Sequence, residues 1–143
     1  MKTILAILLY LWQLPQNLLG ELLVLFYLPQ ETYNFRPYGH HSRHTVLLHY
    51  ASRMLSGISL GKHIILSSIY KDYNGKEESH EYGHCLQSLY LGPLYLPIIG
   101  IPSLLGSIFD RIAHKNWPRE KRIAWYYNQP WEKWADRLGG VER

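Results

Sequence analysis

Residues 80 to 84 read His-Glu-Tyr-Gly-His, and this pentapeptide constrains the fold more than any other segment. Side chains at positions i and i+4 of an α-helix lie one above the other on the same face. On a helix, His80 and His84 can therefore bind one divalent ion while Glu81 stands beside them. The pattern predicts a helix through these residues and a further ligand from another part of the chain.

The residue types in this box suit hydrolysis by a metal-activated water. Neutral imidazole is a good zinc ligand, and catalytic zinc sites use three protein ligands so that a water fills the fourth position, its pKa lowered to about 7. Glu81 cannot easily bend back to the same ion, so it is free to take a proton from that water and pass it to a leaving amine. Glu81 is thus the candidate general base. An amphipathic helix with two incidental histidines is the alternative interpretation.

A third ligand is predicted near the C-terminal end of the chain. Glu132 and Asp136 are four residues apart in a segment that ends like a helix, with Leu138 followed by Gly139 and Gly140. A carboxylate from this second helix would complete a set of two histidines and one glutamate. The acid one turn later could accept the second ring N–H of a ligating histidine and fix its tautomer.

Alternatives stay open for this second motif. The two downstream carboxylates could form a solvated helix face paired with Lys133 and Arg137. Rival third ligands are Asp110, Glu77 and Glu78. The last two lie close to the box on the same rigid element, which makes it hard for them to reach round to the metal.

With these motifs the chain resembles the zincin metallopeptidases, in particular their Glu-liganded (gluzincin-like) branch, in which HExxH is followed by a Glu with an Asp four residues on. The resemblance implies Zn²⁺ bound by His80, His84 and Glu132. It also implies Glu81 as the general base and Asp136 as the hydrogen-bond partner of a ligating histidine.

The chain is also similar to a group of small bacterial membrane-associated proteins. These carry His-Glu-Tyr-Gly-His followed by Gln-Ser, then Leu-Gly-Pro-Leu-Tyr, and a closing Trp-Ala-Asp-Arg-Leu-Gly-Gly-Val, as this sequence does. The likeness covers most of residues 45 to 143. It implies no particular substrate.

Length and composition limit the remaining possibilities. A chain of 143 residues makes one domain, and 47% hydrophobic and 14% aromatic residues are many for a soluble protein of this size. The net charge of +4 suits anionic lipid head groups, and because no RNA- or DNA-binding motif is present we expect no nucleic-acid partner. The single cysteine, Cys85, excludes an internal disulfide and is expected to be a small packed side chain.

Residues 4–28 form the second informative region. Two apolar runs, residues 4–14 and 18–28, are separated by Pro15-Gln16-Asn17, and the second contains Glu21. Each run is about half of the roughly 20 residues that a membrane helix needs, and no small-x-small signal-peptide cleavage site follows. We expect a retained anchor, either a kinked span or a helical pair lying in the membrane interface. A buried two-helix hairpin of the core is the alternative.

This region sets the expected division of the chain. Residues 1–30 would be an apolar membrane-associating segment, and residues 31–143 the metallopeptidase-like domain. Since all predicted site elements follow Thr45, the chain without residues 1–30 is expected to fold and bind zinc. The expected location is the bacterial cell membrane, because the apolar stretch of residues 91–102 beside a basic, aromatic tail of residues 117–134 favours a protein seated against a bilayer.

Between the anchor and the box we expect a polar loop and a small sheet. Residues 29–44 are turn-rich, and the loop's His40, His41 and His44 lack an acidic or cysteine partner for a second metal site. Residues 45–50 and 64–66 read as strands, with Gly57 and Gly61 at turns between them, so three short antiparallel strands are predicted. The stretch 56–60 would either pair with an extended substrate, as the zincin resemblance implies, or be a plain hairpin.

Beyond the box, three prolines at positions 93, 97 and 102 interrupt an apolar stretch. We expect residues 91–102 to be extended or broken and to lead to a helix at residues 103–112. Candidates for stabilising a tetrahedral oxyanion, from residue type alone, are Tyr126, Tyr127 and His114.

The sequence thus predicts an α+β, minimal zincin-like domain with apolar N-terminal helices, acting as a zinc-dependent peptidase on peptides or proteins near a membrane. The non-enzymatic alternative is a membrane-associated or toxin-associated module with a structural zinc. A closed site with four ligands favours the module, whereas an open position faced by Glu81 favours hydrolysis.

Overall fold

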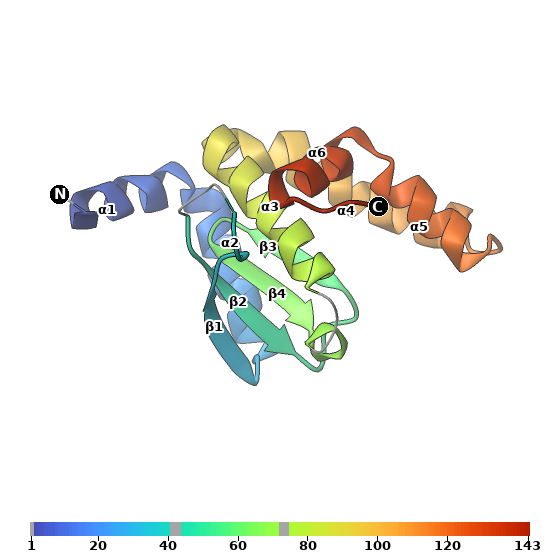
Figure 1. Ribbon diagram of the computed structural model, residues 1–143, viewed down its shortest axis with the longest axis horizontal. Coiled ribbons are helices and arrows are strands. Elements are labelled where there is room, and N and C mark those ends of the chain that lie inside the picture. Colours follow the sequence, from blue (N-terminus) through green and yellow to red (C-terminus); the bar gives the residue numbers. More distant parts are fainter. Residues whose placement is uncertain (1, 41–43, 72–74) are drawn as a thin grey trace.

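The central sheet has four strands in the order β1-β2-β4-β3 (Figure 1). β1 runs antiparallel to β2, β2 parallel to β4, and β3 antiparallel to β4. The structure, a computed structural model, describes residues 2–40, 44–71 and 75–143. The strands are β1 (Glu31–Phe35), β2 (Val46–Ala51), β3 (Gly57–Leu60) and β4 (His63–Ser67). The α-helices are α1 (Lys2–Trp12), α2 (Leu14–Tyr27), α3 (Lys76–Leu91), α4 (Ile101–Ala113), α5 (Arg119–Tyr127) and α6 (Pro130–Gly139).

The α+β class is confirmed, but the expected antiparallel sheet of three strands is corrected to a mixed sheet of four. The additional strand, β1, lies in the stretch expected to be a polar loop; its three central residues are exposed, so it carries no apolar alternation. The parallel pairing of β2 with β4 is a long-range contact that no local pattern encodes. Of the loop histidines, His40 has its Nε2 2.5 Å from the carbonyl oxygen of Leu138, whereas His41 lies outside the described residues.

The two faces of the sheet are covered by different helices. Side chains alternate along β4, so that Ile64 and Leu66 face α3 while Ile65 faces α2. The α3 side is the larger core and consists of Val46, Leu48, Tyr50, Ile64, Leu66, Tyr82, Cys85 and Leu86. Cys85 is thus a small packed core side chain, as expected.

α6 packs directly on α3 through small residues. A Cβ atom added to Gly83 of α3 would lie 1.9 Å from the carbonyl oxygen of Ala135, and one added to Gly139 of α6 would lie 2.0 Å from that of Ser79. Only glycine permits backbones to approach this closely. This approach brings the C-terminal helix, far away in sequence, beside the box.

Of the two alternatives predicted for the proline-rich stretch, extended or broken, the structure shows the second, a broken helical stretch. A 3₁₀ turn (Gly92–Leu94) and a π-helical segment (Leu96–Gly100) follow α3 and run into α4. Each of the three prolines occupies one of the first two positions of its segment, where proline is best tolerated. The helix expected at residues 103–112 is therefore present, and slightly longer.

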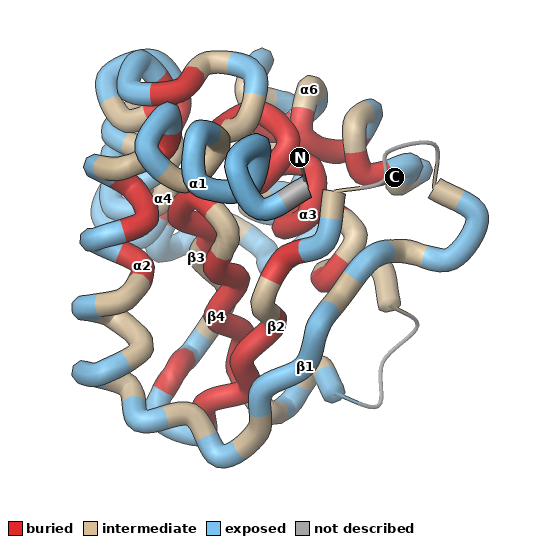
Figure 2. The backbone as a smooth tube through the Cα atoms, turned by 90° about the vertical axis from the view of Figure 1, so that its left-hand side faces the viewer, coloured by how far each residue is buried: buried red, intermediate tan, exposed pale blue. Residues whose placement is uncertain are grey.

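The N-terminal helices meet at an angle of 87° near Gln13 and differ in how they pack. α2 covers the sheet, where Leu23, Val24 and Tyr27 contact the cluster around Ile65. The expected boundary at residue 30 therefore does not separate α2 from the sheet. α1 extends away from the sheet (Figure 1) and is exposed over most of its length (Figure 2).

Much apolar surface stays uncovered on three helices. Exposed large side chains on α1, α2 and α4 are Ile4, Leu5, Ile7, Leu8, Leu11, Trp12, Leu18, Leu19, Leu22, Leu25, Phe26, Ile101, Leu104, Leu105, Ile108, Phe109 and Ile112. Among the described residues, one helical stretch, Leu96–Ala113, has the length and apolarity to cross a membrane, and only 6% of it is buried. α1 and α2 would form a second span only if the bent pair counted as one.

Candidate metal centre

The box lies on α3, and its two histidines turn the same ring nitrogen toward one carboxylate of α6. His80 Nε2 and His84 Nε2 each lie 3.1 Å from Glu132 Oε2. Two ligands of one tetrahedral zinc ion, at bonds of about 2.0 to 2.2 Å, are roughly 3.3 Å apart. The three atoms therefore have the separation that a shared metal ion requires, and all are buried.

The outward ring nitrogens of both histidines are held by oxygen acceptors. His80 Nδ1 lies 2.7 Å from Asp136 Oδ1, and His84 Nδ1 lies 2.7 Å from Gln87 Oε1. A carboxylate and an amide oxygen can only accept, so each Nδ1 carries the proton and each Nε2 can offer a lone pair to a metal. Arg143 Nε in turn donates to both oxygens of Asp136 at 3.1 Å.

The third candidate ligand is fixed in the same way. Glu132 is fully buried, at 0% exposure, and Ser103 Oγ donates to its Oε1 at 2.6 Å. Tyr126 lies within hydrogen-bond distance of the same serine, 3.0 Å from its Oγ. Glu132 Oε2 is thereby left to face the histidines.

Electrostatics favour a cation between these atoms. Burial alone would raise the pKa of Glu132, but the charge of His84 and hydrogen bonds from both histidines hold it well below its usual range. Burial likewise disfavours the charged form of His80, yet its hydrogen bonds with Asp136 and Glu132 raise its pKa to about 9, so a metal ion would have to replace the proton on Nε2. An ionised buried carboxylate with two imidazoles suits a borderline-soft divalent ion.

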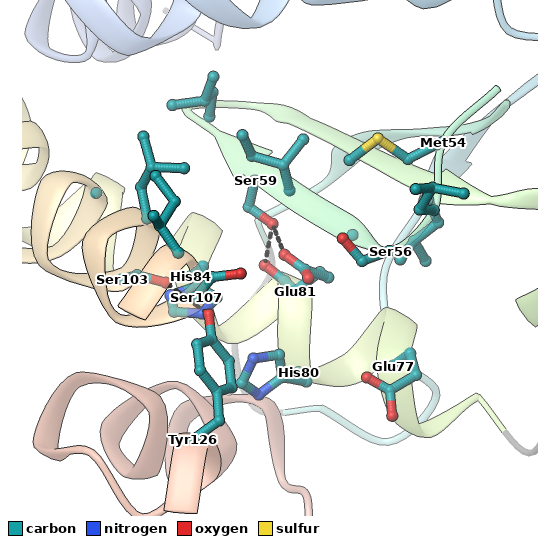
Figure 3. A pocket seen from close by; sticks show the side chains of 18 of the residues that line it. Met54, Ser56, Ser59, Glu77, His80, Glu81, His84, Ser103, Ser107 and Tyr126 are labelled. Carbon is teal, nitrogen blue, oxygen red and sulfur yellow. Dashed lines mark hydrogen bonds between the residues drawn. The ribbon is translucent and has the colours of Figure 1, made fainter. Parts of the chain in front are cut away.

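Glu81 stands beside the cluster without joining it. It extends from α3 toward β3, where Ser59 Oγ donates to its Oε2 at 2.6 Å (Figure 3). The same hydroxyl lies 2.9 Å from the backbone oxygen of Glu81. A Cβ at Gly57 would come within 2.4 Å of Glu81 Oε1, so glycine in the strand makes room for this carboxylate.

A cavity of about 1070 Å³ opens over this side of the cluster. His80, Glu81 and His84 line it, together with both Tyr126 and Tyr127. Figure 3 shows Tyr126 pointing from α5 toward the histidines. Burial, and then the negative charge of Glu132, raise the pKa of Tyr126, so its hydroxyl stays protonated and can donate.

His114, the remaining oxyanion candidate, does not line the cavity. Its ring stacks on Trp117 with centroids 3.8 Å apart, and its Nδ1 lies 3.2 Å from Asp110. The structure brings two of the three candidates to the site and leaves His114 outside it.

The rival ligands are engaged elsewhere. Asp110 accepts from Arg122 at 2.6 Å and lies outside the cluster. Glu77 accepts from the Tyr127 hydroxyl at 3.0 Å, and Glu78 accepts from that of Tyr50 at 2.7 Å. Among the described residues, only His80, His84 and Glu132 form a group of three that could hold a metal ion.

Three site residues escaped the sequence analysis: Gln87, Ser59 and Ser103. Gln87 could have been found, since it lies three residues after His84 on the same helix face. The two serines come from β3 and α4, and nothing in their local sequence relates them to the box.

Comparison with models of protein families, with curated proteins and with solved structures finds no match to this chain.

Proposed function

We propose that this protein is a zinc-dependent metallopeptidase that works at a membrane surface. The observation that carries the proposal is the convergence of His80 Nε2, His84 Nε2 and Glu132 Oε2, with Glu81 facing a large cavity beside them. Zinc held by these three residues would polarise a scissile carbonyl and make a nearby water acidic. The nitrogen and carboxylate donors fit zinc better than Mg²⁺ or Ca²⁺, which prefer oxygen ligands.

Glu81 is the group that moves the proton. Ser59 donates to its Oε2 and leaves Oε1 to accept the proton of an attacking water. The carboxylate then returns this proton to the leaving amine. The single proton of the Ser59 hydroxyl is shared between the side-chain and backbone oxygens of Glu81, which keeps the carboxylate close to β3.

Tyr126 supplies the positive end of a dipole for the oxyanion of the tetrahedral intermediate. Its raised pKa keeps the proton on the hydroxyl over the working range of pH. Because Ser103 gives its own proton to Glu132, the Tyr126 hydroxyl donates to Ser103 Oγ in the structure, and it would turn from Ser103 to the oxyanion during the reaction.

The free edge of the sheet gives an extended peptide a surface to pair with. Ser67 N–H donates to the Ser56 carbonyl, so backbone groups of alternate residues turn toward β4. Those of Gly57 and Ser59 face the opposite edge, beside Glu81. The Ser59 carbonyl there accepts from the Tyr95 hydroxyl at 3.1 Å, so a peptide would pair with the backbone groups of Gly57. Pairing there would align a peptide bond with the candidate base.

Three protein ligands and an adjoining cavity favour hydrolysis over a structural zinc, which is ordinarily closed by four ligands. The membrane setting is supported by the exposed apolar faces of α1, α2 and α4.

The test is Glu81→Gln, assayed for bound zinc and for hydrolysis of a generic peptide library. We expect about one zinc per chain in both forms and a loss of turnover of roughly 10² or more in the variant. Glu120→Gln on the exposed side of α5 is the control and should match the wild type. Unchanged turnover in Glu81→Gln at full zinc occupancy would refute the assigned role. Zinc without any hydrolysis in the wild type would favour the structural module.

A further inference from the structure

The cavity over the cluster lies between two helices whose apolar side chains face both the cavity and the outside. Its walls include Leu19 and Leu22 of α2 and Leu104 and Ile108 of α4. Leu22 is 61% exposed and Leu104 is 57% exposed. A side chain that lines a cavity and is also largely exposed lies at its mouth, so the mouth is apolar on both sides.

The two apolar sides of this mouth are continuous with the exposed apolar faces of α2 and α4. Leu25 and Phe26 extend the apolar surface along α2, and Leu105 and Ile112 extend it along α4; none of the four lines the cavity. An apolar surface this wide is unfavourable in water and favours contact with lipid. If the helices lie in a bilayer interface, the cavity opens into the apolar region rather than into solvent.

The positive charges of the last turn of α4 and of the segment that follows it agree with that orientation. Arg111 and Arg119 line the cavity and are exposed, while Lys115 and Lys121 lie nearby in the sequence and are exposed too. Lys121 lies 3.9 Å from the ring centroid of Trp117, which suits an interfacial belt. Basic side chains at one end of an apolar helix complement anionic head groups.

We infer that the substrate is an apolar polypeptide segment, taken from the bilayer between α2 and α4 and held extended along β3. This inference rests on the proposed peptidase function and adds the class of substrate and its route. The volume of about 1070 Å³ is at or above the upper end of small-ligand pockets, roughly 300 to 1,000 Å³. The backbone groups of Gly57 at the outer edge of β3 match a polypeptide, whereas a lipid chain has no partners for them. The neighbouring Ser59 carbonyl already accepts from the Tyr95 hydroxyl.

The test uses full-length Glu81→Gln protein, so that capture is measured without catalysis. The probe is a synthetic peptide with a leucine-rich segment and a photoreactive residue, inserted in vesicles of phosphatidylcholine and phosphatidylglycerol. A second peptide has the same central residues but serine and glutamine flanks. We expect the apolar peptide to label residues of β3 and the α4 wall at least 10-fold more than the polar one.

Matched variants separate the cavity from general membrane binding. Leu22→Gln with Leu104→Gln changes the two mouth residues, and Leu25→Gln with Leu105→Gln changes two exposed leucines outside the cavity. All four side chains are largely exposed, so both pairs should fold. When equal amounts of each variant are bound to vesicles, labelling by the apolar peptide should fall about 10-fold in the mouth variant and should be unchanged in the control.

Equal labelling in the two variants, or preference for the polar peptide in buffer, would overturn the inference. Labelling by a photoreactive phospholipid in place of the peptide would overturn it as well. Selective capture of the apolar peptide, combined with a wild-type protein that hydrolyses no peptide, would sustain the binding route and reject the peptidase function.

Discussion

Each candidate ligand has its remaining polar atom held by a further side chain: Asp136 for His80, Gln87 for His84 and Ser103 for Glu132. Such contacts orient ligand atoms before the ion arrives and raise the basicity of the imidazoles. The arrangement predicts that residues touching only a ligand matter less than the ligand itself, but measurably.

For the ligands, we expect Glu132→Gln to remove nearly all bound zinc, because an amide in that place neither carries charge nor binds zinc well. Asp136→Asn should keep zinc but weaken its affinity about 10- to 100-fold. Zinc content after dialysis and competition with a chelator measure both effects. Circular dichroism controls for folding. If neither change affects zinc binding, Glu132 is not a ligand.

For the base, Ser59→Ala should lower turnover about 10-fold and leave bound zinc unchanged. A hydrogen bond to a charged group contributes about 1.5 to 3 kcal/mol, and this one holds Glu81 in position. Ser107→Ala, on the α4 wall of the same cavity, is the matched control. The role of Ser59 is disproved if both alanine variants turn over equally.

At the residue scale, the sequence predicted the candidate ligands and one of their hydrogen-bond partners, Asp136, but not the other partners. His80, His84, Glu132 and Asp136 share regular helical spacings, and the structure brings them together. Ser59 and Ser103 reach the site through packing of β3 and α4, which depends on the whole fold and leaves no mark in the neighbouring residues.

Among the elements, the contact of α3 with α6 decides whether the ligands meet. Gly83 lies between His80 and His84, and its missing side chain lets the backbone of Ala135 approach. The two residues between Glu81 and His84 therefore have different structural roles. Tyr82 packs in the core, and Gly83 leaves the space that the backbone of α6 occupies.

Gly83→Ala should destabilise the protein and weaken zinc binding together. The added methyl would meet the Ala135 carbonyl at 1.9 Å, and the resulting overpacking costs about 1 to 3 kcal/mol or more. Gly106→Ala is the control, because its methyl would meet nothing closer than 3.8 Å and should be neutral or stabilise α4 by about 0.5 to 1 kcal/mol. Thermal unfolding and zinc titration measure both; similar behaviour of the two variants would contradict the close-contact argument.

Helices were easier to predict than the sheet for a physical reason. α3 and α6 have regular i, i+4 spacings within their own residues, and α6 ends at the left-handed Gly140. In contrast, β1 is an exposed edge strand, and β2 and β4 pair in parallel across a long separation. The prolines after α3 led to the expectation of an extended or broken chain, because a proline at the start of a new helical segment looks the same in sequence as one that ends a helix.

At the scale of the whole molecule, the sheet packs on α2, a helix whose outer face is apolar and exposed. A buried histidine pair lies between the sheet and this helix. His49 Nε2 is 3.1 Å from His63 Nδ1, and His63 Nε2 is 3.9 Å from Glu21 of α2. Burial, the neighbouring His49 and the charge of Lys62 lower the pKa of His63 to about 4, and Glu21 opposes this only in part.

This pair predicts a loss of stability in mild acid. The unfolded chain binds a proton near pH 6.5 and the folded chain only near pH 4, so the contribution of His63 is complete above pH 6.5 and falls as the pH drops toward 4. The loss is on the order of 2 kcal/mol after allowance for partial solvent access. Urea unfolding at several pH values measures it. His63→Phe, which cannot titrate, should flatten the slope in that window; an unchanged slope would assign the effect to other groups.

The N-terminal helices α1 and α2 should respond differently to deletion, because α1 is mostly exposed whereas α2 packs on the sheet. Removal of residues 1–9 takes away exposed Ile4, Leu5 and Leu8 and leaves α2 on the sheet. We expect this shortened chain to fold, to bind zinc and to partition less into anionic vesicles.

Removal of residues 1–30 should instead give aggregated, zinc-poor protein, contrary to the expectation from sequence alone. Without α2, Ile65 and its neighbours lose their cover, and the hydrogen bonds of Gln16 to Gly92 and of Asn17 to Lys62 are lost as well. Vesicle co-sedimentation and zinc content distinguish the two deletions. A soluble, zinc-loaded chain lacking residues 1–30 would show that α2 only anchors, whereas unchanged vesicle binding without residues 1–9 would place the membrane contact on α2 and α4 alone.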